Sequence, residues 1–181
     1  MLFSPFKKRR PEDFRILMLY PNVQMSGLMP QSIGIFSAIF KSEGFKADLF
    51  DCTYYQDINF NNLGNSADEE RVKNRSRLDY DKSEWYNKGG KPKLGIKEDF
   101  INKVKNFRPN IILVSVLEST HFLAIDLLNS IPKKEKFFKT IFGGVFATYA
   151  TDKIIKDKNV DYVCRGEGES AITEMCKKLA N

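Results

Sequence analysis

The sequence predicts an α/β fold in which five parallel strands form one sheet with helices on both faces. Short apolar runs of strand length alternate along the chain with segments whose apolar residues repeat at helical spacing. The first run, Phe14–Tyr20, is apolar and does not alternate with polar residues, which is typical of a strand buried on both faces of a parallel sheet. A length of 181 residues fits one domain of this kind.

The first three predicted elements form a βαβ unit. The apolar run Phe14–Tyr20 predicts a strand that ends at Pro21. Apolar residues at helical spacing predict a helix over Ser32–Glu43, and Gly44 predicts its end as a left-handed cap. The second strand is predicted over Phe45–Asp51.

A polar stretch, residues 52–95, then interrupts the alternation. It is rich in asparagine, glycine and charged residues and poor in aliphatic ones. A segment of this length without regular structure is uncommon inside a compact domain. We interpret it as a long insertion after the second strand and not as a second domain.

Helices and strands alternate again after the insertion. The predicted helices are Ile96–Phe107, His121–Ile131, Thr148–Lys156 and Gly168–Leu179, and the predicted strands are Ile111–Val116, Phe137–Phe142 and Val160–Val163. The right-handed crossover rule and the number of units favour the strand order 2-1-3-4-5 of flavodoxin-like, doubly wound folds. In such sheets, ligands bind beyond the carboxyl ends of the strands, at the switch between strands one and three. The loops at Pro21, Leu117, Gly143 and Arg165 are therefore predicted to surround a ligand.

The composition is that of an ordinary globular domain, 42% hydrophobic and 29% charged. No apolar run is long enough to cross a bilayer, and the N-terminus has no secretory signal. Three cysteines without paired spacing and a single histidine provide no zinc or iron–sulfur ligand set, and they favour reduced thiols in the cytoplasm. The net charge is +6, and Lys7 to Arg10 in a basic N-terminal tail, residues 1–13, supply four of the positive charges without a nucleic-acid motif. We interpret it as solvated surface and expect neither a nucleic acid nor a membrane as partner.

Two of the loops carry small residues that would let a bulky ligand approach the backbone. Ser115 lies near the end of the third strand with Leu117 two positions later, and Gly143-Gly144 follow the fourth. Both pairs are equally compatible with an ordinary strand end and a tight turn.

The fifth loop, Arg165-Gly166-Glu167-Gly168-Glu169, is the most distinctive stretch of the chain. It follows a strand and opens the last helix. A carboxylate at a helix N-terminus is favoured by the helix dipole by about 0.3–1 kcal/mol, so helix capping alone is one interpretation. The other is that a glutamate accepts hydrogen bonds from amides of a ligand.

These residues together resemble the cobalamin-binding domain of cobalamin-dependent radical S-adenosylmethionine enzymes. The matching pieces are Ser115-x-Leu117, Gly143-Gly144 and the stretch from Val160 to Glu169, and the resemblance covers 14–51 and 96–180. It identifies 14–181 as a cobalamin-binding domain. The nucleotide tail of the bound cobalamin would lie beside the sheet. The implied cofactor contacts are Ser115, Leu117, Glu118, Thr120, Gly143, Gly144, Gly166 and Glu167.

The resemblance also implies a division of labour. The iron–sulfur cluster and S-adenosylmethionine would belong to a radical catalytic domain, joined in cis and lacking in this chain, which carries out methyl transfer or a related radical reaction. The chain ends directly after its last predicted helix, which favours a trimmed piece of such an enzyme. No catalytic residue and no metal ligand are therefore expected here.

One departure concerns the cobalt ligand. Ordinary cobalamin-binding domains carry Asp-x-His-x-x-Gly after the first strand, whereas the loop 21–30 has no histidine. The resemblance therefore predicts a cobalt without an imidazole from this loop, shielded by Leu28 or Met29. His121, the single histidine, is expected at the start of a helix on the ligand side of the sheet, more as a helix-starting polar residue than as a ligand.

A second hypothesis keeps the fold and drops the cofactor. The chain would then be a non-catalytic protein-interaction module. Its contact surface would consist of the basic N-terminus and the aromatic residues of the insertion.

Overall fold

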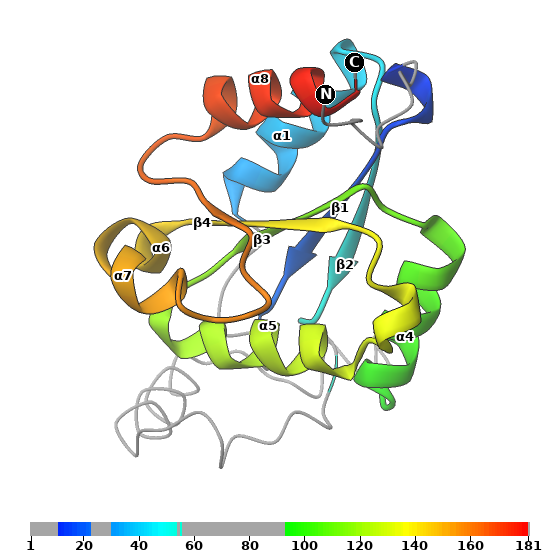
Figure 1. Cartoon of the computed structure of the whole chain (residues 1–181), viewed down its shortest axis with the longest axis vertical. Coiled ribbons are helices and arrows are strands. Elements are labelled where there is room, and N and C mark those ends of the chain that lie inside the picture. The colour runs from blue at the N-terminus through cyan, green and yellow to red at the C-terminus, as the bar shows by residue number, and fades with distance from the viewer. Residues whose placement is uncertain (1–10, 23–29, 54, 56–92, 181) are drawn as a thin grey trace, which may run out of the picture.

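Five parallel strands form a single sheet in the computed structural model, which describes residues 11–22, 30–53, 55 and 93–180 (Figure 1). The order along the sheet is β2-β1-β3-β4-β5, as the sequence predicts. The strands are β1 (Arg15–Tyr20), β2 (Lys46–Asp51), β3 (Ile111–Ser115), β4 (Lys139–Gly143) and β5 (Tyr162–Val163).

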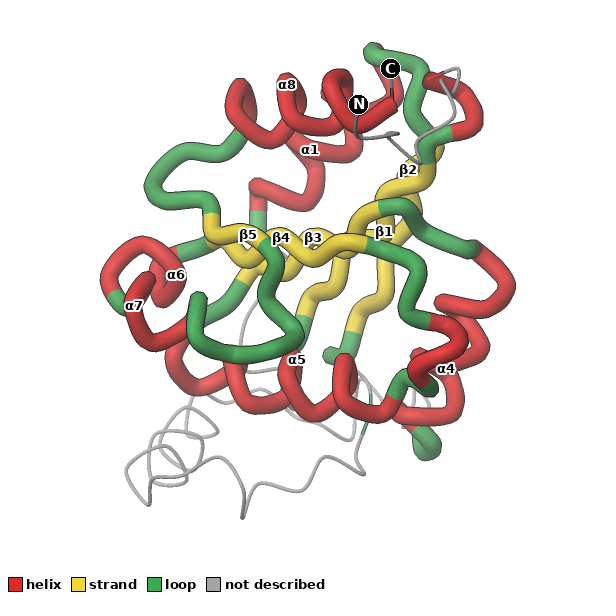
Figure 2. Tube along the Cα trace, in the orientation of Figure 1, coloured by secondary structure: helices red, strands yellow, loops and turns green. Residues whose placement is uncertain are grey.

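Helices cover both faces of this sheet (Figure 2). Helices α1 (Gln31–Ser42) and α8 (Glu169–Ala180) pack together on one face, and α4 (Ile96–Phe107) and α5 (Glu118–Ser130) on the other. The short helices α6 (Val145–Tyr149) and α7 (Thr151–Ile154) follow β4 and lie beside its end. Two single turns of 3-10 helix, Pro11–Asp13 and Lys133–Glu135, precede β1 and β4.

The side chains of the central strands build two hydrophobic cores. Alternate residues of a strand point to opposite faces of a sheet. Leu17 and Leu19 of β1 therefore join the core under α4 and α5, while Ile16 and Met18 join the core under α1 and α8. Burial on both faces explains why the central strands β1 and β3 are mostly apolar and do not alternate with polar residues.

The observed helix boundaries differ from the predicted ones by more than one residue in two places. Helix α5 begins at Glu118 and not at His121. The Thr120 hydroxyl oxygen accepts a hydrogen bond from the Leu117 N–H at 3.0 Å, which stabilises the earlier start. The helix predicted over Thr148–Lys156 is two short helices, α6 and α7, because the backbone leaves helical geometry at Ala150, where φ is −119°.

The described residues at the two ends of the predicted insertion lie next to each other. Tyr55 and Lys93 form an isolated parallel bridge. The Tyr55 hydroxyl donates a hydrogen bond to the Asp99 carboxylate of α4 at 2.7 Å, and its ring stacks on Phe50 at 5.8 Å between centroids. The rest of the insertion (54 and 56–92) and the basic tail (1–10) lie outside the described residues.

Candidate functional site

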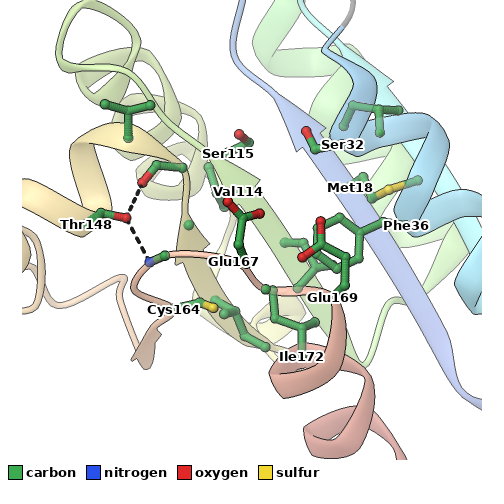
Figure 3. A pocket seen from close by; sticks show the side chains of 18 of the residues that line it. Met18, Ser32, Phe36, Val114, Ser115, Thr148, Cys164, Glu167, Glu169 and Ile172 are labelled. Carbon is green, nitrogen blue, oxygen red and sulfur yellow. Dashed lines mark hydrogen bonds between the residues drawn. The ribbon is translucent and has the colours of Figure 1, made fainter.

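A cavity of about 370 Å³ lies between the sheet and helices α1 and α8, at the carboxyl ends of the strands (Figure 3). The ends of β1, β3 and β4 form its floor, α1 forms one wall, and α6 with the loop between β5 and α8 forms the opposite wall. The strand order reverses between β1 and β3, and ligands of doubly wound sheets bind at that point. The cavity is within the size range of small-molecule sites.

Two adjacent glycines shape the floor in different ways. A Cβ on Gly143 would meet only the Cβ of Cys164, at 4.0 Å, so the missing side chain leaves open space. A Cβ on Gly144 would lie 2.9 Å from the Val116 carbonyl oxygen and 3.1 Å from the Ser115 hydroxyl oxygen. Gly144 also has a φ of 92°, which side chains rarely allow. Gly143 therefore keeps the floor open, and Gly144 lets the turn after β4 pack tightly against β3.

The loop between β5 and α8 brings carboxylates to the cavity. Glu167 and Glu169 both line it, and their side chains point into it together with Ser115 and Ser32 (Figure 3). No lysine, arginine or histidine is among the described residues that line the cavity. The polar groups that face a ligand are thus mainly hydrogen-bond acceptors and hydroxyls.

A buried glycine allows this loop to approach the helices. A Cβ on Gly168 would lie 2.8 Å from the Ile172 side chain and 3.2 Å from the Phe36 ring. The absent side chain thus lets the start of α8 pack directly against α1. This contact closes the cavity on its apolar side.

Five of the eight predicted contact residues come together here. They belong to three different loops and all line the cavity: Ser115, Gly143, Gly144, Gly166 and Glu167. The other three lie at the start of α5 and do not line it. Leu117 is 53% exposed and Glu118 is exposed, whereas Thr120 is buried and its hydroxyl bonds to the Leu117 backbone.

Several lining residues were not predicted from the sequence. Ile33 and Phe36 of α1 and Ile172 of α8 give the cavity its apolar wall. Their helical spacing was visible in the sequence, but it only indicated a buried face. Helix α6 adds Val145 and Tyr149, which are 60% and 86% exposed at the rim. No signal in the sequence distinguishes these two from ordinary surface residues.

The position expected for His121 was wrong. Its ring lies against Phe142 and Phe146, at centroid distances of 6.4 and 5.3 Å, on the face of the sheet opposite the cavity. The side chain is 7% exposed, and neither ring nitrogen has a hydrogen-bond partner in the described structure. Desolvation lowers the pKa of the imidazole below its ordinary value. The correct face could have been deduced, because right-handed crossovers that run in opposite directions from the switch place their helices on opposite faces.

The three thiols differ in access. Cys52 and Cys176 are buried, and burial raises the pKa of both, that of Cys176 to about 12. Cys164 is half-buried and lines the cavity, and its pKa is raised by burial and by the nearby Glu169 carboxylate. All three are free thiols.

Within the described ranges, no three histidine, cysteine, aspartate or glutamate side chains are grouped to hold a metal ion. In the same ranges, no helix combines the length and the apolar character needed to cross a membrane. The loop 23–29, which includes Leu28 and Met29, lies outside the described residues.

Comparisons with known proteins agree with this geometry. A model of the B12 binding domain family matches residues 53–175, more than half of the chain. None of the curated proteins matches the chain by sequence. Two solved structures share its fold: the radical S-adenosylmethionine methyltransferase TsrM from Kitasatospora setae, one with tryptophan substrate and a SAM analog, the other with cobalamin and a [4Fe-4S] cluster. Each has a TM-score of 0.61 and 13% identity, and the match covers 92% of this chain but only 26% of TsrM.

Proposed function

Because the chain belongs to the B12-binding domain family, we propose that it holds a cobalamin in the cavity at the carboxyl ends of its strands. The observation that carries the proposal is the open floor at the carboxyl ends of β3 and β4, next to the switch between β1 and β3. There, Ser115 pairs in register with Gly143, and no side chain fills the space above the glycine. A planar group can lie directly on the backbone at such a place.

The residues that line the cavity suit the nucleotide tail of the cofactor. Ile33, Phe36 and Ile172 offer an apolar wall to an aromatic base. The hydroxyl of Ser115 and the carboxylate of Glu167 can accept hydrogen bonds from ribose hydroxyls and amides. We therefore assign the tail to the cavity, in contact with the five predicted residues that line it.

The corrin ring would then lie outside the cavity, at the same edge of the sheet. Exposed residues at that edge would meet it: Leu117 and Glu118 at the start of α5, and Val145 and Tyr149 of α6. Thr120 contributes indirectly, since its hydroxyl holds the Leu117 backbone. When bound, cobalamin supplies a cobalt centre for the transfer of a methyl group or a radical.

The larger enzyme is also part of this proposal. We infer that the domain presents its cofactor to a radical S-adenosylmethionine domain. That domain would carry the iron–sulfur cluster and S-adenosylmethionine. The shared fold with TsrM and the stretch from Arg165 to Glu169 support this inference. His121 lies on the far face, so we propose that it does not ligate cobalt. A spectrum of the bound cofactor with an axial nitrogen from the protein would contradict this point.

A retention experiment tests the proposed function. The purified chain is incubated with hydroxocobalamin and desalted, and its visible spectrum is recorded. We expect about one cobalamin per chain. A chain that is folded by circular dichroism and retains no cobalamin would instead favour the protein-interaction module.

A pair of variants places the cofactor in the cavity. Gly143→Leu puts a bulky side chain above the open floor, so retention should be lost while the circular dichroism spectrum stays unchanged. Gly34→Leu is the matched control, because Gly34 is exposed on α1 and a Cβ there meets nothing within 4 Å. Equal retention by both variants would place the cofactor elsewhere.

A further inference from the structure

We propose that Thr148 is a positioning residue, whose side-chain hydroxyl fastens two loops around the cavity to each other. The inference rests on the proposed function, since it concerns the site where cobalamin would bind. Thr148 itself lines the cavity from α6, and the resemblance in the sequence did not include it.

One oxygen atom makes both connections. The Thr148 hydroxyl donates a hydrogen bond to the Gly144 carbonyl oxygen at 3.0 Å. The same oxygen accepts a hydrogen bond from the Gly166 N–H, also at 3.0 Å (Figure 3). Gly144 begins the turn after β4, and Gly166 belongs to the loop between β5 and α8. Thr148 thus joins the two glycine-containing loops of the cavity.

Gly166 itself has few other contacts within this loop. Gly166 is exposed, has a φ of 70°, and would bring a Cβ within 4 Å of nothing. The last bond of the sheet before it is the one from the Cys164 N–H to the Phe142 carbonyl at 2.8 Å. Glu167, which points into the cavity, comes directly after Gly166. The bond to Thr148 therefore fixes the backbone that aims the Glu167 carboxylate.

Ordinary helix chemistry accounts for only one of the two bonds. Threonines in helices commonly bond to the carbonyl four residues earlier. Thr151 does so to Ala147 at 2.7 Å, and Thr173 to Glu169 at 2.5 Å. In the described structure, neither of these hydroxyls accepts an N–H from another loop. The bond from Gly166 sets Thr148 apart, and Thr151 is a natural control for the local bond.

The expected effect is that of one hydrogen bond. The typical net contribution of such a bond corresponds to a change of roughly 2- to 13-fold in an equilibrium constant. Loss of the hydroxyl leaves the Gly166 loop free to move away from α6. We expect cobalamin to dissociate from Thr148→Val faster by a factor in this range.

The test compares cobalamin dissociation from the unmodified chain, Thr148→Val, Thr148→Ser and Thr151→Val, together with hydrogen exchange at the Gly166 amide. Thr148→Val removes the hydroxyl at nearly constant shape, and Thr148→Ser keeps it. We expect faster dissociation and faster Gly166 exchange in Thr148→Val alone. A merely structural role would lower the stability of the Thr148 and Thr151 valine variants alike without a selective effect on dissociation.

Three results would overturn the inference. If the unmodified chain retains no cobalamin, the proposed function fails and the positioning role fails with it. If the unmodified chain retains cobalamin and Thr148→Val releases it at the same rate, only the positioning role is wrong. If Thr148→Val does not fold, the Gly166 amide of the unmodified chain decides: protection supports the bond, and exchange at the rate of an open amide refutes the inference.

Discussion

The two adjacent glycines on the cavity floor should respond very differently to the same small change. Gly144→Ala adds a methyl group 2.9 Å from the Val116 carbonyl oxygen and 3.0 Å from the Val116 nitrogen. Both are backbone atoms of a buried residue and cannot move aside easily. Gly143→Ala adds the same methyl group with its nearest neighbour 4.0 Å away.

The magnitude follows from two contributions. Gly144 has φ 92° and ψ −176°, a conformation that is nearly restricted to glycine and costs other residues about 1–3 kcal/mol. Overpacking against buried atoms costs about 1–3 kcal/mol more. We therefore expect the free energy of unfolding to fall by roughly 2–6 kcal/mol in Gly144→Ala, out of the about 5–15 kcal/mol typical of a domain. For Gly143→Ala we expect a change below about 1 kcal/mol.

Urea denaturation followed by circular dichroism measures both values. The two variants should differ in the midpoint and not in the slope, because the surface exposed on unfolding is the same. Equal destabilisation of the two variants would refute the assignment of different roles to these glycines. A loss below about 0.5 kcal/mol for Gly144→Ala would show that the turn can relax, and the close packing of β3 against this turn would have to be abandoned.

Three further predictions concern buried groups. Burial lowers the pKa of His121 in the folded chain below its ordinary value of 6.5. Between the folded-state pKa and the unfolded-state pKa, the unfolded chain therefore binds more protons than the folded chain. The free energy of unfolding should fall as the pH decreases through this range. His121→Phe should remove this part of the pH dependence in urea titrations from about pH 7 to 5, and an unchanged slope would contradict it. Cys164 should react with a thiol reagent in the folded chain, while the buried Cys52 and Cys176 stay protected. Because Cys164 lines the cavity, bound cobalamin should slow its reaction. Equal reaction rates with and without cobalamin would argue against cobalamin binding in the cavity. Phe100→Ala should lower the free energy of unfolding by about 3–5 kcal/mol, because Phe100 is fully buried and packs edge-on against Phe50 at 4.9 Å between ring centroids. Phe137→Ala is the control, since the Phe137 side chain is 43% exposed. A loss for Phe100→Ala no larger than that for Phe137→Ala would refute this packing argument.

The order of the strands and the place of the cavity follow from short-range patterns. Apolar runs and helical spacing give the elements, and the handedness of crossovers gives their order in the sheet. The carboxyl ends of parallel strands lie at one edge. Residues at or just beyond those ends, such as Ser115, Gly143 and Glu167, are therefore predicted from the sequence to surround one site, and all three line the cavity.

The predicted cofactor contacts at the start of α5 could not be checked by short-range patterns alone. Leu117, Glu118 and Thr120 also follow a strand, yet they do not line the cavity. The helix begins three residues earlier than predicted, and its first turn lies on the far face of the sheet. The side chain of Thr120 satisfies a backbone N–H of its own helix, a local use that competes with ligand binding.

The sequence by itself thus determined the sheet, its strand order, the edge that carries the cavity and five of the residues that line it. Tertiary structure decided that Gly143 leaves open space and that Gly144 permits a close approach of two backbone segments. It also decided the exposure of Val145 and Tyr149 at the rim of the cavity and the hydrogen bond between Thr148 and Gly166. The physical reason is the range of the interactions. Periodicity and crossovers depend on neighbours along the chain, whereas a bond between two loops depends on where β4, β5 and their helices finally lie in space.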